Sequence, residues 1–300
     1  MAIELIAPAK INLYLKVLFR RPDGYHELRT LFQTVELADR VVLEPREDGR
    51  VLLECDRPGI PTDGTNLCVR AAEALKEATG TTSGARIRLF KNIPDKAGLG
   101  GGSSDAAATL AGLDRLWKTG LGREALAELG RGLGADVPFF LAGGTALGIG
   151  RGDEIIPLPD LPPCWVVLVF PAVVVSTPWA YGQLNLLLTN SDATTNIPRL
   201  RGFSPDSDTL LQMAENDFET VVFKAYPELS RIKDQLRAAG GCPALMSGSG
   251  SSVYGVFRSE AQSRRAAQLL ENGPTPGRVV VTRFLPSGIT GAPHSAAVVH

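Results

Sequence analysis

Four glycines within five residues, Gly98 to Gly102, stand between a short β-rich segment and a long apolar helix pattern. The segment before them, ARIRLF, is typical of a strand, and the segment after them repeats apolar residues every three or four positions. Glycine lets backbone N–H groups approach an anion closely, and a helix that begins directly afterwards adds the positive end of its dipole. The order of strand, glycine loop and helix therefore predicts a phosphate-binding loop.

The predicted nucleotide-binding residues of this loop are Pro94, Gly98, Leu99, Gly100, Gly101, Gly102, Ser103 and Ser104. We expect the helix to begin at Ser103 or Ser104, whose hydroxyls would cap it and bond phosphate oxygens or magnesium, with Ser104 as the candidate metal ligand. The loop fits neither a Rossmann nor a Walker site, because Ser103 replaces the third glycine and no Lys-Ser/Thr pair follows. A flexible surface turn is the alternative, and the roles of Lys96 and Asp105 stay open.

The rest of the sequence alternates strand and helix patterns, which predicts an α+β fold. Four prolines within residues 157–163 indicate a boundary between two domains, 1–158 and 159–300. We expect helices over 66–79, 123–133, a stretch from Tyr226, and 259–270. The expected strands include INLYLKV, RVVLEP, VLLEC, CWVVLVF, ALMSG, SVYGVF and RVVVTRF. A polar loop is expected over 190–208, and the tail after Pro286 is expected to fray.

The composition argues against several classes of protein. A net charge of −1 gives no electrostatic attraction for nucleic acid or anionic lipid. The four cysteines form no CxxC pair, so we expect reduced thiols and no metal or disulfide framework. Glu4, Lys10 and Asn12 interrupt the N-terminal apolar segment, and the longest apolar run is too short for a membrane span of ~20 residues. We therefore expect a cytoplasmic protein without membrane or nucleic-acid partners.

Two further stretches, APAKINLYLKV and MSGSGSSVYGVF, lie on either side of the glycine loop. With that loop they resemble the superfamily of galactokinase, homoserine kinase, mevalonate kinase and phosphomevalonate kinase, the GHMP kinases. RPDGYHELRTLFQTVEL and LGADVPFFLAGGTALGIGRGD resemble its branch that uses ATP to phosphorylate the 2-hydroxyl of a cytidine-diphosphate-linked methylerythritol in non-mevalonate isoprenoid synthesis. The resemblance implies ATP and Mg²⁺, and a two-domain GHMP kinase fold with a ribosomal S5-like N-terminal domain and a ferredoxin-like C-terminal domain.

The resemblance implies that Asp136 and Lys10 are the catalytic residues. Asp136, in LGADVP, lies at an expected helix-to-loop junction and would take the proton of the attacking hydroxyl. Lys10 would lie beside it, keep the carboxylate ionised and offset charge on the transferring phosphoryl group. Asn12 follows on the same strand face, within reach of the alcohol or a phosphate. The alternatives are an ordinary N-cap or turn role for Asp136 and a solvated outer face for Lys10.

The resemblance also implies the substrate-binding residues Asn12, Tyr25, His26, Thr177, Tyr181, Gly248 and Ser249. His26 would hydrogen-bond cytosine, Tyr25 would stack on one face of the ring, and Tyr181 would close the other face. Trp179 competes for the Tyr181 position, and a buried core role stays open for either aromatic. The loop of residues 247–252 would approach the glycine loop from the second domain; a plain hairpin turn is the alternative.

Two other functions stay open. One is another GHMP-type kinase that acts on homoserine, a sugar or mevalonate. The other is a catalytically silent module that binds a nucleotide or RNA, since an S5-like fold also occurs in RNA binding. His294 and His300 lie in the expected tail, which leaves His26 as the candidate histidine and argues against a Ser-His-Asp hydrolase. The expected partner is a small-molecule substrate, and the expected assembly is a monomer or a weak homodimer.

Overall fold

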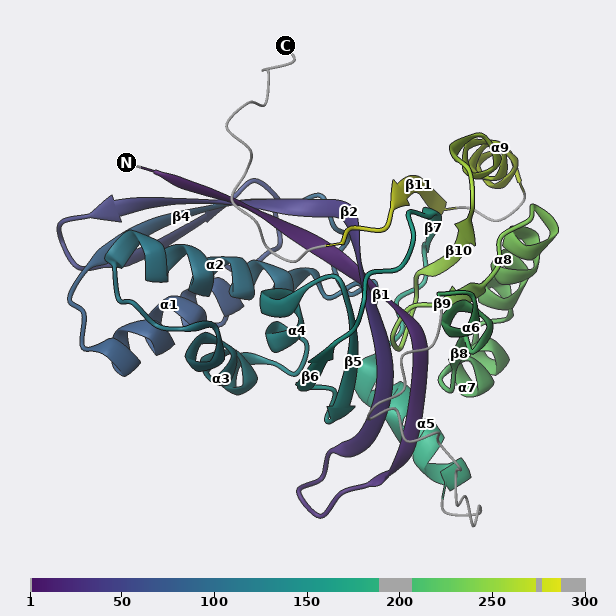
Figure 1. Cartoon of the computed structure of the whole chain (residues 1–300), viewed down its shortest axis with the longest axis horizontal. Coiled ribbons are helices and arrows are strands. Elements are labelled where there is room, and N and C mark those ends of the chain that lie inside the picture. Colours follow the sequence, from purple (N-terminus) through teal and green to yellow (C-terminus); the bar gives the residue numbers. More distant parts are fainter. Residues whose placement is uncertain (1, 189–206, 274–276, 287–300) are drawn as a thin grey trace.

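The computed structural model describes residues 2–188, 207–273 and 277–286. These residues form a seven-stranded sheet and a four-stranded sheet, with helices packed on each (Figure 1). The predicted tail after Pro286 and nearly all of the predicted loop over 190–208 lie outside the described residues. The architecture confirms the predicted α+β fold.

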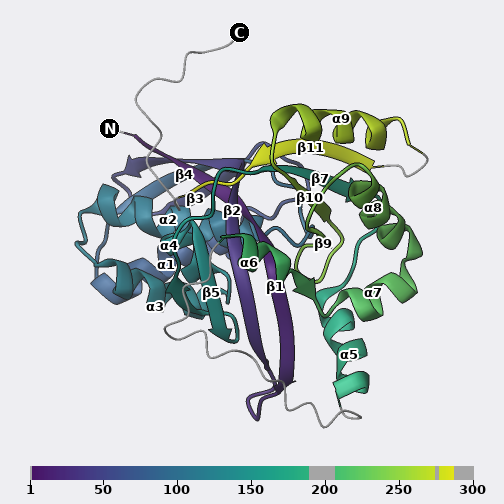
Figure 2. The same cartoon turned by 45° about the vertical axis from the view of Figure 1, so that its right-hand side comes forward.

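The larger sheet is built around a long antiparallel pair, β1 (Ile3–Arg20) and β2 (His26–Arg46), which continues beyond the sheet as a hairpin (Figure 2). Its strand order is β3-β4-β2-β1-β8, and β5 pairs with both β2 and β6. The further bounds are β3 (Val51–Cys55), β4 (Gly84–Phe90), β5 (Thr145–Gly150) and β6 (Glu154–Pro157). The strand predicted over INLYLKV is therefore one part of a much longer strand.

Helices α1 to α4 gather on one side of the larger sheet (Figure 1). Their bounds are α1 (Leu67–Thr79), α2 (Gly101–Trp117), α3 (Arg123–Leu133) and α4 (Val137–Ala142). The first helix ends as its sequence predicts, because Asn66 accepts a hydrogen bond from the Cys68 N–H and Gly80 takes a left-handed φ of 68°. The short helix α4 carries no periodic signal and was not expected.

The start of α2 corrects the sequence analysis. The helix begins at Gly101, and Gly100 occupies the N-cap position with a left-handed φ of 71°. No side chain caps this end, so Ser103 and Ser104 lie inside the first turn and do not act as caps. Because Gly101 and Gly102 lie in the first turn of the helix, two of its unpaired N–H groups belong to residues without side chains that would block an approaching anion.

The smaller sheet has the order β11-β7-β10-β9, and α8 and α9 pack against it. Its strands are β7 (Trp165–Pro171), β9 (Ala244–Met246), β10 (Val253–Phe257) and β11 (Gly277–Arg283). The helices of this half are α5 (Thr177–Leu188), α6 (Ser207–Gln212), α7 (Glu219–Ala225), α8 (Pro227–Ala238) and α9 (Glu260–Glu271). The strand and helix patterns read from this half of the sequence are confirmed.

One strand crosses between the halves. The two-residue strand β8 (Glu215–Asn216) lies late in the sequence but pairs in parallel with β1 at Tyr14 and Leu15. One apolar core correspondingly contains Leu15 and Val17 of β1 together with Val167 and Phe218. The division of the chain at residue 158 therefore stays a prediction.

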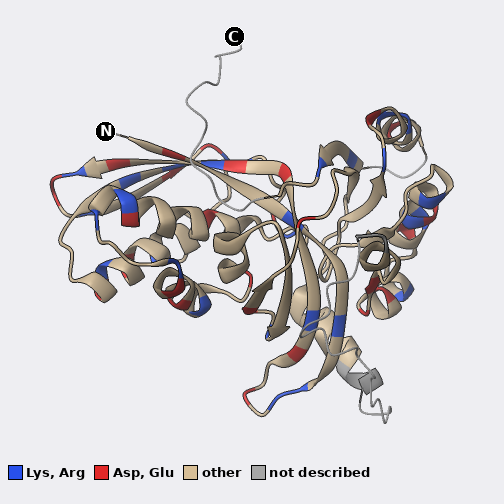
Figure 3. Cartoon of the chain, in the orientation of Figure 1, with Lys and Arg blue, Asp and Glu red and all other residues tan. Residues whose placement is uncertain are grey.

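Figure 3 shows basic and acidic residues of both signs scattered over the strands and helices. This distribution agrees with the net charge of −1. Within the described part of the chain, no helix is both long enough and apolar enough to span a membrane.

The packing of α2 on the sheet predicts that alanine substitutions at two helical glycines change the free energy of unfolding in opposite directions. A Cβ on Gly112 would lie 2.3 Å from Leu43 Cδ1 and 2.4 Å from Leu5 Cδ1, whereas a Cβ on the exposed Gly132 of α3 meets nothing within 4 Å. We expect Gly112→Ala to lower the free energy of unfolding by about 1–3 kcal/mol through overpacking.

Gly132→Ala is the matched control and should raise that free energy by about 0.5–1 kcal/mol through helix propensity. Urea denaturation measures the free energy of unfolding of both variants. Equal effects of the two substitutions would contradict the close packing of α2.

Candidate active site

A hollow of about 630 Å³ lies between β1, the hairpin, α5 and two loops. Its wall brings together every predicted catalytic and substrate-binding residue: Lys10, Asn12, Tyr25, His26, Asp136, Thr177, Tyr181, Gly248 and Ser249. These positions are spread over more than two hundred residues of sequence. Their convergence identifies this hollow, called the main cavity below, as the candidate active site.

A second hollow of about 230 Å³ is lined by the glycine loop. Its wall contains all the predicted nucleotide-binding residues except Ser104: Pro94, Gly98, Leu99, Gly100, Gly101, Gly102 and Ser103. Gly98, Gly100 and Ser103 line both hollows, so the two are neighbours. The arrangement can hold a phosphate chain in the small hollow with its end directed at the main cavity.

Lys10 lies in the floor of the main cavity and is only 4% exposed. Its Nζ donates to Asn12 Oδ1 at 2.7 Å, and Asn12 Nδ2 donates to Thr30 Oγ1 at 2.7 Å. The Thr30 hydroxyl in turn donates to the Tyr14 carbonyl at 2.9 Å. This chain of hydrogen bonds fixes the ammonium in place and removes the alternative of a solvated outer lysine.

Asp136 faces Lys10 across the cavity, with 3.6 Å between Asp136 Oδ2 and Lys10 Nζ. Asp136 occupies the N-cap position of α4, but its side chain makes no capping hydrogen bond. Its carboxylate is therefore not engaged by the helix, which argues against an ordinary N-cap role. A carboxylate held beside an ammonium in a partly buried site is a candidate proton acceptor.

The glycine loop touches the loop of residues 247–252, called the serine loop below. Ser247 Oγ donates to the Gly98 carbonyl at 3.0 Å, and the Ser252 N–H donates to the Ala97 carbonyl at 3.3 Å. A Cβ on Gly98 would lie 2.2 Å from the Ser247 carbonyl oxygen. The approach therefore requires glycine at position 98, and the serine loop is more than a hairpin turn between β9 and β10.

An aromatic group lines the side of the main cavity next to the hairpin. His26 stacks on Tyr181 with 4.7 Å between ring centroids, and Phe218 meets Tyr181 edge-on at 4.8 Å. Burial and then the nearby Asp136 carboxylate raise the pKa of the Tyr181 phenol, so it stays protonated. Trp179, the competing candidate, packs against Tyr226 and does not line the cavity.

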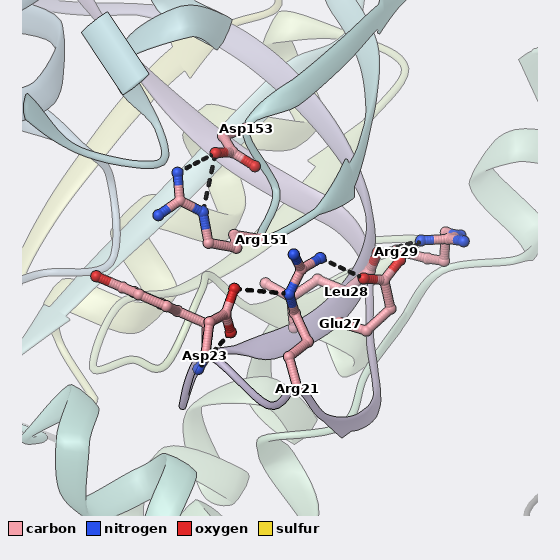
Figure 4. A network of polar contacts seen from close by, with 8 residues as sticks. Arg21, Asp23, Glu27, Leu28, Arg29, Arg151 and Asp153 are labelled. Atoms are coloured by element: carbon pink, nitrogen blue, oxygen red, sulfur yellow. Dashed lines mark hydrogen bonds and ion pairs between the residues drawn. The ribbon is translucent and has the colours of Figure 1, made fainter. Parts of the chain in front are cut away.

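Tyr25 lies at the cavity rim and is 56% exposed. The Arg151 guanidinium lies 4.9 Å from the centre of its ring, and Arg151 also binds Asp153 through Nη2 at 2.5 Å and Nε at 3.0 Å. On the hairpin below, Arg21 and Arg29 both bind Glu27 (Figure 4). These contacts leave Arg151 as a cation in the cavity wall beside an exposed aromatic ring.

Several residues that line the main cavity were not predicted from the sequence, among them Arg151, Thr30 and Phe32. Arg151 lies in a glycine-rich turn after β5, and no pattern in the sequence marked it as a site residue. Thr30 and Phe32 lie on β2. The alternation of β2 could have identified the two strand residues, because positions 28, 30 and 32 point to one face and all line the cavity.

Asp105 does not face the phosphate site. It is 3% exposed, and its Oδ2 accepts a hydrogen bond from Lys91 Nζ at 2.7 Å, while Lys91 also binds Asp39. Burial raises the pKa of Asp105 to about 8, against the opposing effect of Lys91. The Asp105 side chain is engaged by Lys91 and lines neither hollow.

The described residues contain no group of three or more His, Cys, Asp or Glu that could hold a metal ion. The Ser104 hydroxyl is fully buried, has no hydrogen-bond partner and lines neither hollow. This placement argues against Ser104 as a metal or phosphate ligand.

Comparison with known proteins agrees with this geometry. The GHMP kinase N-terminal domain family matches residues 66–144, and the GHMP kinase C-terminal family matches residues 203–274. A 4-diphosphocytidyl-2-C-methyl-D-erythritol kinase from Geobacter metallireducens is 45% identical over 90% of this chain and 95% of its own length. The kinase of that name from Geobacillus sp. WCH70 is 43% identical over 86% of this chain and 89% of its own.

Solved structures of GHMP kinases are also similar to this chain. A crystal structure of 4-(cytidine 5'-diphospho)-2C-methyl-D-erythritol kinase superposes with a TM-score of 0.75 at 40% identity, covering 94% of this chain and 99% of the other. A homoserine kinase from Cytophaga hutchinsonii has the same TM-score at 20% identity, covering 96% of each chain, which shows the shared fold alone.

The fold and the two adjoining hollows are those of a GHMP kinase, an enzyme that phosphorylates a small molecule. Within this superfamily the chain belongs to the 4-diphosphocytidyl-2-C-methyl-D-erythritol kinase family.

The contact between the two loops predicts that Gly98→Ala weakens nucleotide binding. The added methyl group meets a backbone oxygen, so both loops must move apart and part of the nucleotide hollow is lost. We expect roughly tenfold or greater loss of affinity for ADP, measured by calorimetry.

Gly59→Ala is the control, because Gly59 also has a positive φ, of 87°, but a Cβ there meets nothing within 4 Å. It should cost only about 1–2 kcal/mol of stability and leave ADP binding unchanged. Unchanged ADP binding in Gly98→Ala would show that the loop contact is dispensable.

Proposed function

We propose that this enzyme transfers the γ-phosphoryl group of ATP to the 2-hydroxyl of 4-diphosphocytidyl-2-C-methyl-D-erythritol. The observation that carries the proposal is the pair Lys10 and Asp136, 3.6 Å apart in a cavity that opens onto the glycine loop. The names of the relatives at 43–45% identity supply the substrate.

In the proposed reaction the substrate hydroxyl oxygen attacks the γ-phosphorus. The new oxygen–phosphorus bond forms as the bond to the bridging oxygen of ADP breaks, and the hydroxyl proton passes to Asp136 Oδ2. The acceptor is a tertiary alcohol with a very high pKa, so its proton must leave as the bond to phosphorus forms. The products are ADP and a phosphate monoester.

Lys10 has two functions in this proposal. Its ammonium lies 3.6 Å from the Asp136 carboxylate and would hold that carboxylate toward the alcohol. It also offsets negative charge that develops on the phosphoryl oxygens in the transition state. The hydrogen bond from Lys10 Nζ to Asn12 restricts the ammonium to this position before substrate arrives, which supports both functions.

ATP would enter as its magnesium complex, and the metal would offset negative charge on the phosphates. The N–H groups of the first turn of α2 and the partial positive charge of that helix would bind the phosphates. The glycines of this turn allow the backbone to contact the phosphates directly.

At the far end of the cavity the hairpin would bind the cytidine group. Tyr25 is exposed and free to stack on the base, and His26 and Tyr181 present ring atoms to the same space. Arg151 lines the same cavity beside Tyr25, and its guanidinium would pair with the diphosphate of the substrate.

A coupled assay of ADP release tests the proposed reaction. The purified enzyme receives Mg–ATP with the cytidyl substrate, homoserine, mevalonate or galactose. We expect turnover of the cytidyl substrate alone, and about 10²–10⁴-fold lower kcat in Asp136→Asn because the proton acceptor is lost.

Asp63→Asn, the same change at an exposed site outside the cavity, should match the wild type. Turnover of a different alcohol would reassign the substrate. Absence of phosphoryl transfer with ATP bound would favour a silent binding module instead.

The cytidine end is tested by Tyr25→Ala. We expect a roughly tenfold rise in KM for the cytidyl substrate with little change in kcat, because base stacking contributes about 1–3 kcal/mol. Phe19→Ala removes a second aromatic ring of the hairpin, 54% exposed and outside the cavity, and should leave KM unchanged. If Tyr25→Ala had the same KM as the wild type, the cytosine base would not stack on Tyr25.

A further inference from the structure

A five-residue segment, Glu215 to Glu219, connects the two halves of the active site, and the reaction proposed above gives it no role. It contains the strand β8, which pairs with β1 at Tyr14 and Leu15, only two residues beyond Asn12. The segment then continues to Phe218, which lines the main cavity and contacts Tyr181 edge-on. We call residues 215–219 the clasp.

The outer side chains of the clasp hold it to β1. Lys16 Nζ lies 2.9 Å from Glu215 Oε1 and 3.0 Å from Asp217 Oδ1. Asp217 Oδ2 also accepts a hydrogen bond from the Val17 N–H at 2.8 Å, and the Asp217 N–H donates to the Leu15 carbonyl at 3.0 Å. Both side-chain and backbone bonds therefore fix the clasp to the strand that carries Lys10 and Asn12.

The inner side chains of the clasp hold the serine loop. Asn216 is 3% exposed, and its Nδ2 donates to the Met246 carbonyl at 2.7 Å and to the Gly248 carbonyl at 2.8 Å. Its Oδ1 accepts from the Phe218 N–H at 3.0 Å, so every hydrogen-bonding atom of this amide is used. Glu219 Oε1 accepts from the Met246 N–H at 2.8 Å.

The hydrogen bonds of Asn216 hold the part of the serine loop that faces the main cavity. Gly248 and Ser249 line the main cavity, and their N–H groups donate to no acceptor within the described residues. The Gly248 backbone is left-handed, with φ of 57°, and a Cβ there would lie 3.6 Å from Asn12 Oδ1. Successive free N–H groups in such a turn form a site for phosphate oxygens.

We propose that Asn216 is a positioning residue of this kinase: by holding the Met246 and Gly248 carbonyls from β8, it aims the serine loop at the transferring phosphoryl group. The inference rests on the proposed phosphoryl transfer in this cavity. Ser247, bonded to Gly98, passes the same restraint to the glycine loop. An amide is suited to this role because its NH₂ group satisfies two carbonyls while its oxygen holds the clasp backbone.

Asn216→Asp provides the first test. The substitution keeps the acceptor for Phe218 and the size of the side chain, but it replaces two donated hydrogen bonds with an oxygen facing two carbonyl oxygens. We expect kcat to fall more than thirtyfold, with less than threefold change in KM for either substrate, because alignment matters most in the transition state. A rise in KM with kcat unchanged would overturn the proposal.

Asn272→Asp is the matched control. Asn272 Nδ2 also donates to a backbone carbonyl, that of Gln268 at 2.8 Å, but on the exposed end of α9. Its kinetic constants should equal those of the wild type. Equal losses in both variants would show that the change of amide to acid, and not its position, is responsible, which would overturn the proposal.

Asn216→Ala extends the test without adding a charge, in case the aspartate variant does not fold. In a double-mutant cycle with Ser249→Ala, the double variant should lose no more than about twofold beyond the worse single variant, because both changes act through one loop. Paired with Tyr25→Ala at the cytidine end, the losses should multiply. Multiplying losses with Ser249→Ala would overturn the proposal.

Hydrogen exchange followed by mass spectrometry separates this inference from the proposed reaction. In Asn216→Ala the peptide that contains residues 247–252 should exchange at least tenfold faster than in the wild type, whether or not any alcohol is phosphorylated. Unchanged exchange there would overturn the positioning role alone. A wild-type enzyme that phosphorylates none of the alcohols would instead refute the proposed function.

Discussion

The close approach of the glycine loop and the serine loop is the constraint on which the rest of the site depends. The loops come from different sheets and meet where a Cβ on Gly98 would lie 2.2 Å from the Ser247 carbonyl oxygen. This approach places the nucleotide hollow against the main cavity, with Gly98 and Gly100 in both walls. A kinase must bring a phosphoryl donor and an acceptor within bonding distance, and here the backbone of two loops creates that meeting point.

The electrostatics of the site separate two buried lysines by function. Lys91 is neutralised by Asp39 and Asp105 beneath the glycine loop, so its charge supports structure. Within the described residues, Lys10 forms an ion pair with the partly exposed Asp136, and that carboxylate lines the main cavity. A buried cation with a single carboxylate partner still exerts a net electrostatic attraction on a negatively charged substrate group. A cation held between two carboxylates exerts much less.

The sequence predicted most of the secondary structure because local signals agree with the tertiary fold. The helix closed by Gly80, the helix from Pro227 and the buried strand β7 all follow from periodicity and end signals. The residues that converge on the main cavity were predicted through the family resemblance, since spacing alone cannot bring Lys10 and Asp136 together. The start of α2 was missed because serine is a common N-cap residue, and the left-handed Gly100 replaces it only in the folded backbone.

The clasp shows what sequence patterns cannot encode. AENDFE is too short for periodicity and resembles a polar turn, yet β8 returns to β1 from the far half of the chain and Asn216 bonds two carbonyls that lie 30 and 32 residues later. Such contacts depend on topology, because a two-residue strand pairs only where the rest of the fold has already left an open edge. The strand order also joins the two halves of the chain, because the larger sheet takes its strand β8 from the second half and the main cavity is lined by residues of both halves.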